Sequence, residues 1–339
     1  MKIEHSILIS LGMVLFLILI TCGGATAAEL GIKQITTNVA SQQNPAISGE
    51  IIVWQDKCSG NWDIYMYDIS STEGEIQLTT TTDFQGHPAI SDDIIVWQDN
   101  PSGLNGWDNI FMHNIASGEN KWITNNNNAF QWNPAISGEI IVWQDKRSGN
   151  NDIYMYDISA KEEKRLTTST ASQQNPAISG DIIVWQDWRN ENWDIYMYDI
   201  SSTEGEIRLT TTTDFQWYPA ISGDIIVWED YYYGYNNIYM HDISSGDEKW
   251  ISNNNANQWD PAISGDIIVW QDERNGNWDI YKFTLDPIEN LADLQDYVND
   301  EELSASTVKT LNKKLDSAIT LFNKGEEDRK STRLNSSHG

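Results

Sequence analysis

The chain is built on one pattern of apolar and polar positions that returns six times. Its clearest copy reads PAISGEIIVWQD, at residues 45–56. A short segment opened by proline, which is tolerated at a strand start, is followed by a Ser-Gly-Glu turn and an unbroken apolar run. Such runs are typical of strands that are buried on both faces. The prolines of the six copies are Pro45, Pro88, Pro134, Pro176, Pro219 and Pro261, and the tryptophans are Trp54, Trp97, Trp143, Trp185, Trp228 and Trp270.

Two further strands complete each copy. In the first copy, DIYMYDI at residues 63–69 predicts a third strand and IQLTT at residues 76–80 a fourth, with polar turn residues between them. Successive prolines lie 43, 46, 42, 43 and 42 residues apart. Four short strands in a period of this length are typical of one propeller blade. The pattern therefore predicts an all-β fold, a six-bladed β-propeller of four-stranded blades.

The sixth copy lacks its fourth strand, and a matching segment precedes the first copy. KQITTNVASQQNP at residues 33–45 resembles KRLTTSTASQQNP at residues 164–176, which follows the third copy. Copies one to three resemble copies four to six as blocks. We therefore expect the N-terminal strand, residues 32–37, to complete the sixth blade and close the ring, which would leave no open sheet edge.

The two ends of the chain differ from the repeats. Residues 1–28 combine an early lysine, an apolar run and a small-residue cleavage motif, as in a secretory signal peptide. A retained anchor and lipid attachment at Cys22 are alternatives, and all three predict a secreted or cell-surface protein. Residues 29–286 are the propeller, and residues 287–327 follow the spacing of a short α-helical hairpin. Residues 328–339 resemble a translated sequencing adapter and are excluded from the fold.

Charge and cysteine content narrow the possible partners. Asp and Glu number 50 against 21 Lys and Arg, and the formal charge is −29. Such a field repels nucleic acid and anionic lipid. We therefore expect no nucleic-acid partner, no membrane insertion of the mature chain, and a monomer. Cys22 and Cys58 are the only cysteines in the sequence, so a disulfide framework or a cysteine-based metal site is excluded.

The recurring aspartates between the second and third strands are the remaining candidates for a metal site. Asp145 and Asp152 flank KRSGNN, which lacks the alternating oxygen-ligand spacing of an EF-hand loop. We interpret these carboxylates as groups that close turns, and we expect no cofactor and no metal. A weakly bound Ca²⁺ stays an alternative.

The repeat resembles that of TolB-type propellers. The shared elements are L-T-T, then P-A-I-S-G-D-I-I-V-W-Q-D, then G-N-x-D-I-Y, and they recur over residues 32–286. Ser-Pro-Asp-Gly of that family is replaced here by Ser-Gly-Asp or Ser-Gly-Glu. The sequence style is similar to secreted or cell-surface propellers of methanogenic archaea. Residues 294–328 resemble the first two helices of a FIMAH domain, which is found at the ends of extracellular proteins. The resemblance implies a repeat class rather than one activity.

Candidate binding residues lie in the long loops, which a propeller gathers at one mouth of its ring. Aromatic rings beside amides can stack on sugars or anchor a protein. The predicted ligand-binding residues are Trp132, Trp217, Tyr218, Trp259, Phe84, Phe130, Trp188, Tyr232, Gln131, Gln216 and Gln258. For the glutamines, which recur three residues before each proline, the alternative is that their amides bond to the loop backbone. Trp62, Trp107, Trp193 and Trp278 recur at one repeat position, and we interpret them as blade-packing residues.

The sequence carries no enzyme signature. There is no G-x-S-x-G motif, and His113 and His241 are three blades apart, too far to share a metal. No catalytic residues are therefore predicted. The favoured function is a non-catalytic extracellular propeller that binds a protein or a glycan through its aromatic loop face. A polysaccharide lyase or glycosidase with its site at the mouth is the alternative, and it would need carboxylates or histidines converging there. A cell-envelope scaffold without a small ligand is a third hypothesis.

Overall fold

The computed structural model describes residues 35–36, 40–58, 60–101, 107–125, 129–252, 254–276, 278–285 and 312. The predicted leader, the predicted helical segment apart from residue 312, and the adapter-like tail lie outside these residues. Within the described residues, no helix is both long enough and apolar enough to cross a bilayer.

Six antiparallel sheets follow one another along the chain, one for each copy of the repeat. Blade 1 holds β1 (Gln42–Ser48), β2 (Ile51–Asp56), β3 (Asp63–Asp68) and β4 (Glu75–Gln77). Blade 2 holds β5 (Phe84–Ser91), β6 (Ile94–Asn100), β7 (Asn109–Asn114) and β8 (Asn120–Trp122). Blade 3 holds β9 (Gln131–Ser137), β10 (Ile140–Asp145), β11 (Asp152–Asp157) and β12 (Glu162–Arg165).

The second half repeats this order. Blade 4 holds β13 (Gln173–Ser179), β14 (Ile182–Asp187), β15 (Asp194–Asp199) and β16 (Glu206–Arg208). Blade 5 holds β17 (Gln216–Ser222), β18 (Ile225–Tyr232), β19 (Tyr235–Asp242) and β20 (Glu248–Trp250). In the described residues, blade 6 holds β21 (Gln258–Ser264), β22 (Ile267–Asp272) and β23 (Asp279–Thr284).

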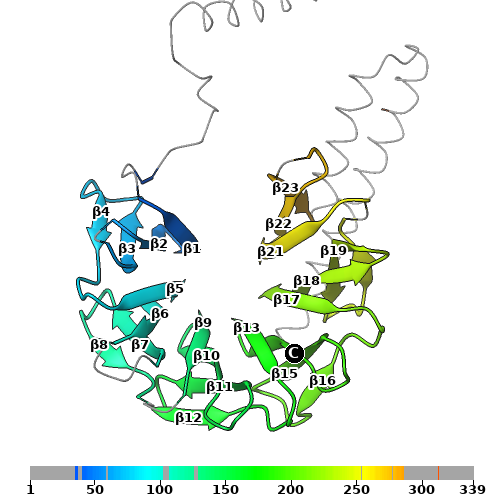
Figure 1. Ribbon diagram of the computed structural model, residues 1–339, viewed down its shortest axis with the longest axis horizontal. Helices are drawn as coiled ribbons and strands as arrows, with labels where there is room; N and C mark the ends of the chain where they lie inside the picture. Colours follow the sequence, from blue (N-terminus) through cyan, green and yellow to red (C-terminus); the bar gives the residue numbers. More distant parts are fainter. Residues whose placement is uncertain are drawn as a thin grey trace, which may run out of the picture.

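The sheets are arranged around a common axis, and the first strand of each blade lies nearest to it (Figure 1). The predicted six-bladed propeller is confirmed. The core lies between neighbouring blades: Val142 and Ile153 of blade 3 pack in one cluster with Trp185 of blade 4. The second strands of blades 2 to 5 are buried on both faces over most of their length, as their unbroken apolar runs predict, whereas burial alternates along β22 of blade 6.

The repeated Trp-x-Asp sequence has a structural cause. Each tryptophan of the second strand is almost completely buried, and its indole Nε1–H donates to the carboxylate two residues later. The bond from Trp143 to Asp145 measures 3.0 Å, and the bond from Trp185 to Asp187 measures 3.1 Å. A buried indole N–H needs such a partner. In blades 1, 3, 4 and 6 the second carboxylate oxygen accepts a backbone N–H of the following loop, as Asp145 does from Arg147. The prediction that these aspartates close turns is therefore confirmed for this position.

Blades 1 and 6 are the first and the last sheet around the axis (Figure 1). Ile47 of β1 is 61% exposed, whereas its counterparts in blades 2 to 5 are each 8% exposed. Of the predicted closing strand, residues 32–37, only Ile35 and Thr36 are described, and neither is assigned to a strand. Pairing of this segment with β23 therefore stays a prediction.

The two described residues of that segment contact blade 1. Ile35 packs on the cluster of Trp54, Tyr65 and Tyr67. Thr36 Oγ1 donates to Gln42 Oε1 at 3.3 Å, as Thr124 Oγ1 of blade 2 donates to Gln131 at 3.3 Å.

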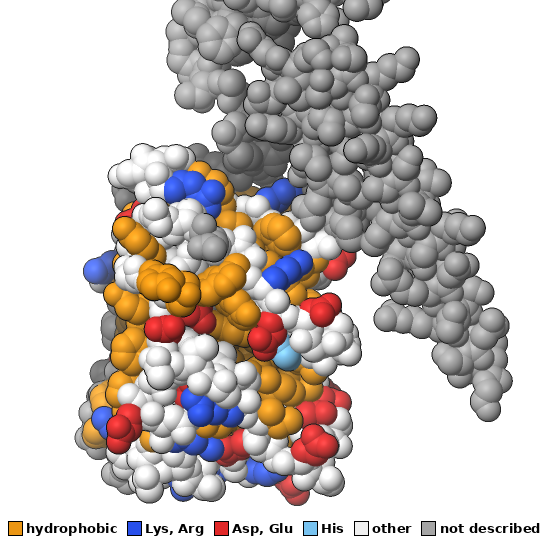
Figure 2. Space-filling model, turned by 90° about the vertical axis from the view of Figure 1, so that its right-hand side faces the viewer, with side chains coloured by type: hydrophobic (Ala, Val, Ile, Leu, Met, Phe, Trp, Pro, Cys, Tyr) orange, Lys and Arg blue, Asp and Glu red, His pale blue; other side chains and the backbone are white. Residues whose placement is uncertain are grey.

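The outer side of the ring is not uniformly acidic. Figure 2 views the side on which β19 and β23 lie, and apolar side chains form patches there between acidic and basic groups. Exposed apolar side chains of this half of the chain include Tyr233, at 85% exposed, and Ile280, at 73%.

Candidate functional site

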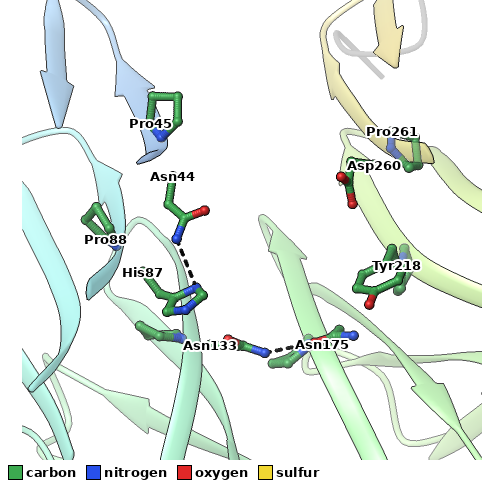
Figure 3. A pocket seen from close by; sticks show the side chains of 12 residues that line it. Asn44, Pro45, His87, Pro88, Asn133, Asn175, Tyr218, Asp260 and Pro261 are labelled. Atoms are coloured by element: carbon green, nitrogen blue, oxygen red, sulfur yellow. Dashed lines mark hydrogen bonds between the residues drawn. The ribbon is translucent and has the colours of Figure 1, made fainter. Parts of the chain in front are cut away.

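A ring of six side chains lines the channel along the axis, and each precedes the proline of its blade. The ring consists of Asn44, His87, Asn133, Asn175, Tyr218 and Asp260. Every one of them has a positive φ, between 48° and 53°. A register shift in each first strand, such as that between Gln43 and Ala46, is a β-bulge that re-aims the side chain. The bulges open a cavity of about 550 Å³ at the axis (Figure 3).

Side-chain amides on the second strands connect these bulges from blade to blade. Gln55 Oε1 of blade 1 accepts the backbone N–H of His87 in blade 2 at 2.9 Å. Gln186 Oε1 of blade 4 accepts the N–H of Tyr218 in blade 5 at 3.0 Å. Because the bulged residue has no partner in its own sheet, the amide of the previous blade satisfies its N–H.

Blade 5 departs from this pattern in one residue. Five blades carry glutamine after the tryptophan, and blade 5 carries Glu229. Its Oε1 accepts the N–H of Asp260 at 2.8 Å, and its Oε2 accepts Nδ2–H of Asn236 at 3.1 Å. Asp260 is itself the only acid in the channel ring, and its Oδ2 accepts from Gln271 at 2.8 Å. Glu229 and Asp260, each the one acidic residue at its repeat position, are therefore in contact.

Tyr218 is a second departure in the same region. Asn, Asp and His tolerate the left-handed region, but a bulky tyrosine at φ 48° is an outlier. Its side chain is 50% exposed and points toward the channel in Figure 3, so burial of the ring does not offset the strain. Strained residues concentrate at functional sites.

These departures share one cavity, which we call the mouth pocket. Its volume is about 540 Å³, within the range of small-ligand sites. Its walls are formed by Gln174, Gln186, Trp193, Trp217, Tyr218, Glu229, Asn236, Trp259 and Asp260. Four aromatic side chains from blades 4, 5 and 6 thus surround amide and carboxylate groups, and Tyr218 and Asp260 also line the axial channel.

The electrostatics of the mouth pocket are set by Glu229, which is 2% exposed. Burial is the main cause that raises the pKa of its carboxyl group, the hydrogen bonds from Asp260 N–H and Asn236 oppose the rise, and the charge of Asp260 adds to it. The resulting pKa is about 7. A carboxyl group with such a pKa changes its charge near neutral pH. The pocket therefore gains one negative charge as the pH rises through about 7.

Three of the predicted binding residues meet in this pocket. Trp217, Tyr218 and Trp259 all line it, and Trp259 also packs on Trp278 with ring centroids 4.8 Å apart. Trp188 is not among the residues that line the pocket, but its ring packs on that of Trp193 with centroids 5.2 Å apart.

The other predicted aromatic residues lie in different places. Trp132 stacks on Phe130 at 4.9 Å in blade 3 and donates to Asp108 at 2.9 Å. Phe84 opens β5 and is half-buried in blade 2. Tyr232 packs on Trp250 at 5.4 Å, beside a separate cavity of blade 5.

The prediction that Gln131, Gln216 and Gln258 contact the ligand is wrong. All three are 0% exposed. Gln131 Nε2–H donates to the carbonyl of Ala129 at 2.8 Å, and Gln216 Nε2–H donates to Thr212 at 2.7 Å. The β-bulge turns the residue just before proline, rather than this glutamine, into the channel. The amides therefore serve the loops, which is the alternative interpretation of this position.

Several residues of the mouth pocket are absent from the sequence-based prediction. The recurrence of Trp193 at one repeat position favours a packing role, yet this residue forms part of the wall. Glu229 and Asp260 are detectable in the sequence as the acidic exceptions at two repeat positions. Among the described residues, no group of three or more His, Cys, Asp or Glu side chains is arranged to hold a metal ion.

Comparison with known proteins supports the fold. A scan against models of protein families finds no match, and a search of curated proteins finds none either. A protein assigned as TolB from Agrobacterium tumefaciens is similar in structure, with a TM-score of 0.51 and 18% identity over 64% of this chain and 83% of that one. TolB from Acinetobacter baumannii gives a TM-score of 0.51 and 19% identity over 66% of this chain.

Peptidases are also among the similar structures. A prolyl endopeptidase gives a TM-score of 0.56 and 13% identity over 73% of this chain. The match spans 41% of that enzyme and 57% of the Acinetobacter protein. At these identities the likeness concerns the fold, which is that of a TolB-like propeller, and leaves catalytic activity open.

Proposed function

We propose that this chain is a non-catalytic, extracellular binding propeller that recognises a glycan or a protein through the mouth pocket. The leader-like residues 1–28 support the extracellular location. TolB-like propeller folds are compatible with a binding scaffold, because a rigid ring can present variable loops at one mouth.

One observation carries the proposal. The aromatic residues that vary between blades, Trp217, Tyr218 and Trp259, converge on the cavity that also holds Glu229 and Asp260. Aromatic faces beside amide and carboxylate oxygens provide stacking and hydrogen bonds for sugar rings. Tyr218 is held at a strained φ in this position. Of the two ligand classes, the pocket chemistry therefore favours a glycan.

A glycan array probed with the full chain tests the proposal. We expect binding to a restricted set of glycans, and we expect Trp217→Ala and Trp259→Ala to remove it. Trp122→Ala is the matched control, since Trp122 is 38% exposed on β8 of blade 2, outside the mouth pocket. Equal binding by all three variants would assign the glycans to another surface. Absence of glycan binding would exclude a sugar ligand and leave a protein partner.

The acidic pair gives the enzyme alternative a specific basis. Glycosidases use two carboxyl groups, one of them an acid with a raised pKa, and burial raises the pKa of Glu229 to about 7 beside Asp260. In this second candidate, Glu229 is the general acid and Asp260 the second carboxylate. Release of reducing ends from a bound glycan, lost in Glu229→Gln, would establish it. Binding without release supports the non-catalytic propeller.

A further inference from the structure

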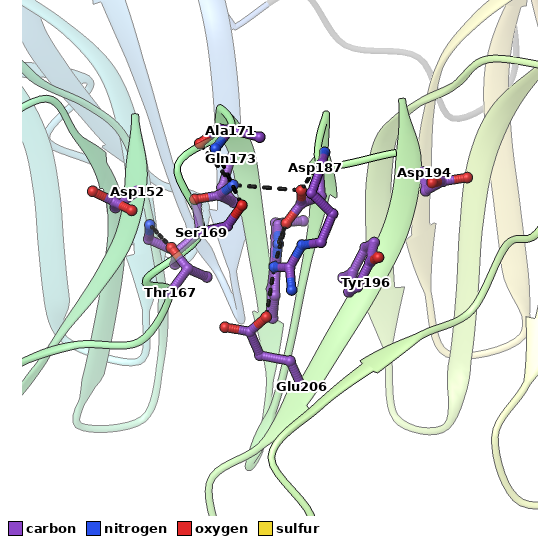
Figure 4. Close-up of polar contacts among 12 residues, drawn as sticks. Asp152, Thr167, Ser169, Ala171, Gln173, Asp187, Asp194, Tyr196 and Glu206 are labelled. Atoms are coloured by element: carbon purple, nitrogen blue, oxygen red, sulfur yellow. Dashed lines mark hydrogen bonds and ion pairs between the residues drawn. The ribbon is translucent and has the colours of Figure 1, made fainter. Parts of the chain in front are cut away.

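Blades 3 and 4 contain the same half-buried arginine site and blade 6 contains part of it, which provides a template within the chain. In blade 4, Arg189 Nη2 lies 2.6 Å from Asp187 Oδ2 and 2.5 Å from Glu206 Oε2, and its guanidinium lies 4.2 Å from the ring centroid of Tyr196. Figure 4 shows Asp187, Tyr196 and Glu206 around this site. The guanidinium is thus held by two carboxylates and an aromatic face, a combination that suits arginine better than lysine.

Blade 3 repeats these contacts, and blade 6 repeats those with the aspartate and the tyrosine. In blade 3, Arg147 contacts Asp145 at 2.6 Å and Glu163 at 2.5 Å, and lies 4.4 Å from the ring centroid of Tyr154. In blade 6, Arg274 pairs with Asp272 and lies 4.0 Å from the ring centroid of Tyr281.

Blade 5 keeps the acceptors and lacks the arginine. By strand register, Asp230, Tyr239 and Glu248 correspond to Asp187, Tyr196 and Glu206. The arginine position holds Tyr232. Here β18 and β19 are longer than in the other blades and pair as far as Tyr232 with Tyr235, so a tight hairpin replaces the loop that carries the arginine elsewhere.

A cavity lies where blade 4 has its guanidinium. Its volume is about 240 Å³, and Asp230, Tyr239 and Glu248 are all in its wall. Asp214, Tyr232 and Trp250 contribute a third carboxylate and two more aromatic rings. Asp230 is only 8% exposed. Glu248 is exposed to solvent, and its Oε1 lies 3.1 Å from Nδ1 of His241.

Blade 1 also keeps the acceptors, as Asp56, Tyr65 and Glu75, but its arginine position holds Cys58, whose Sγ lies 2.7 Å from the Tyr65 hydroxyl. Blade 2 differs from blade 5 in the acceptors themselves. It also lacks the arginine, but its corresponding residues are Phe111 and Asn120 in place of the tyrosine and the glutamate. Blade 2 has thus lost the tyrosine and the glutamate together with the arginine and keeps only Asp99, while blade 5 has retained all three acceptors.

We propose that the cavity of blade 5 binds the guanidinium group of an arginine side chain from another polypeptide. Asp230 and Glu248 would accept its N–H groups, and the ring of Tyr239 would stack on its plane, as the equivalent residues do for Arg189. The overall charge of −29 attracts such a basic partner. Burial raises the pKa of the Asp230 carboxyl to about 6, and the nearby charge of Asp214 adds to the rise. A bound guanidinium would oppose this rise.

Calorimetric titration of the full chain with N-acetyl-L-arginine amide at pH 8 tests the proposal. We expect a dissociation constant on the order of millimolar for a single side chain. N-acetyl-L-citrulline amide, a neutral analogue of similar shape, should bind at least about tenfold more weakly. The lysine analogue should also bind more weakly, because an ammonium cannot bridge both carboxylates with a planar fork. Free L-arginine should bind less well than the amide, since its carboxylate faces an acidic wall.

Two variants and a control locate the site. Glu248→Gln and Asp230→Asn should each weaken binding about tenfold. Glu248 is exposed, so its substitution leaves the fold intact. Glu204→Gln removes the same charge from an exposed turn outside the cavity and should leave binding unchanged. The proposal is overturned if the arginine amide does not bind, if citrulline amide binds equally, or if Glu248→Gln and Glu204→Gln behave alike.

Discussion

Replacing Glu229 with glutamine should stabilise the propeller, by an amount that grows as the pH rises above about 4.5 and is complete above the pKa of the native carboxyl group, about 7. Five blades carry glutamine here, and in three of them, as Gln55, Gln144 and Gln186, it accepts a backbone N–H of the next blade. The side-chain oxygen of the introduced glutamine can keep the bond from Asp260 N–H, and the amide of Asn236 can rotate to present its oxygen. The substitution then removes only the charge of a side chain that is 2% exposed.

The magnitude follows from the pKa of Glu229. Burial raises it from 4.5 to about 7, and a shift of that size corresponds to about 3 kcal/mol. The folded state binds the proton more tightly than the unfolded state, so the free energy of unfolding falls as the pH rises from about 4.5 to about 7 and stays low above that range. Below pH 4.5 both states are protonated, and the carboxyl group costs nothing.

Urea unfolding of both proteins at about pH 4.5 and about pH 8, followed by tryptophan fluorescence, measures the effect. Glu229→Gln should be more stable than the parent by about 3 kcal/mol at the higher pH and by less than about 1 kcal/mol at the lower pH. Asp99 and Asp230, whose pKa values burial also raises to about 6, are present in both proteins and cancel in the difference. The same difference at the two pH values, or a loss of stability at the higher pH, would refute the reasoning.

Three further changes test other parts of the structure. Tyr218→Asn should raise the free energy of unfolding by about 1 kcal/mol, because asparagine tolerates a positive φ, and it should also weaken ligand binding. Urea unfolding measures the first effect and a binding titration the second. A variant that is less stable than the parent would contradict the assignment of strain to Tyr218. Arg189→Met should lower the free energy of unfolding by about 3 kcal/mol by leaving Asp187 buried without its cation, and a loss below about 1 kcal/mol in urea would argue against this role. A chelator should leave the melting temperature unchanged, whereas a clear drop would point to a bound Ca²⁺.

The sequence is sufficient to predict the repeat architecture. Each blade is specified locally, by an apolar second strand, by proline at the first strand, and by a tryptophan bonded to the aspartate two residues later. These features recur with a nearly constant period, so the blade number follows directly. The closing strand is also predicted from the sequence, and its pairing with the sixth blade stays a prediction.

The functional site is harder to predict because it depends on where side chains point. A β-bulge turns the residue before proline into the channel and buries the glutamine two residues earlier. The ring residues vary from asparagine to tyrosine, and this diversity conceals the shared backbone conformation. Trp193 occupies the same repeat position as Trp62 and faces the mouth pocket together with Trp217 of the next blade. The period of the repeat is the same for both tryptophans, so it cannot predict that only one of them lines the pocket.

The most direct test of the binding function is the affinity of one array-selected ligand for three variants of the full chain. Isothermal titration should show that Trp217→Ala and Trp259→Ala each weaken binding by at least about tenfold, equivalent to about 1.4 kcal/mol. Trp122→Ala on β8 should bind like the parent protein. Unchanged affinity in both pocket variants, or an equal loss in Trp122→Ala, would contradict the assignment of the mouth pocket as the binding site.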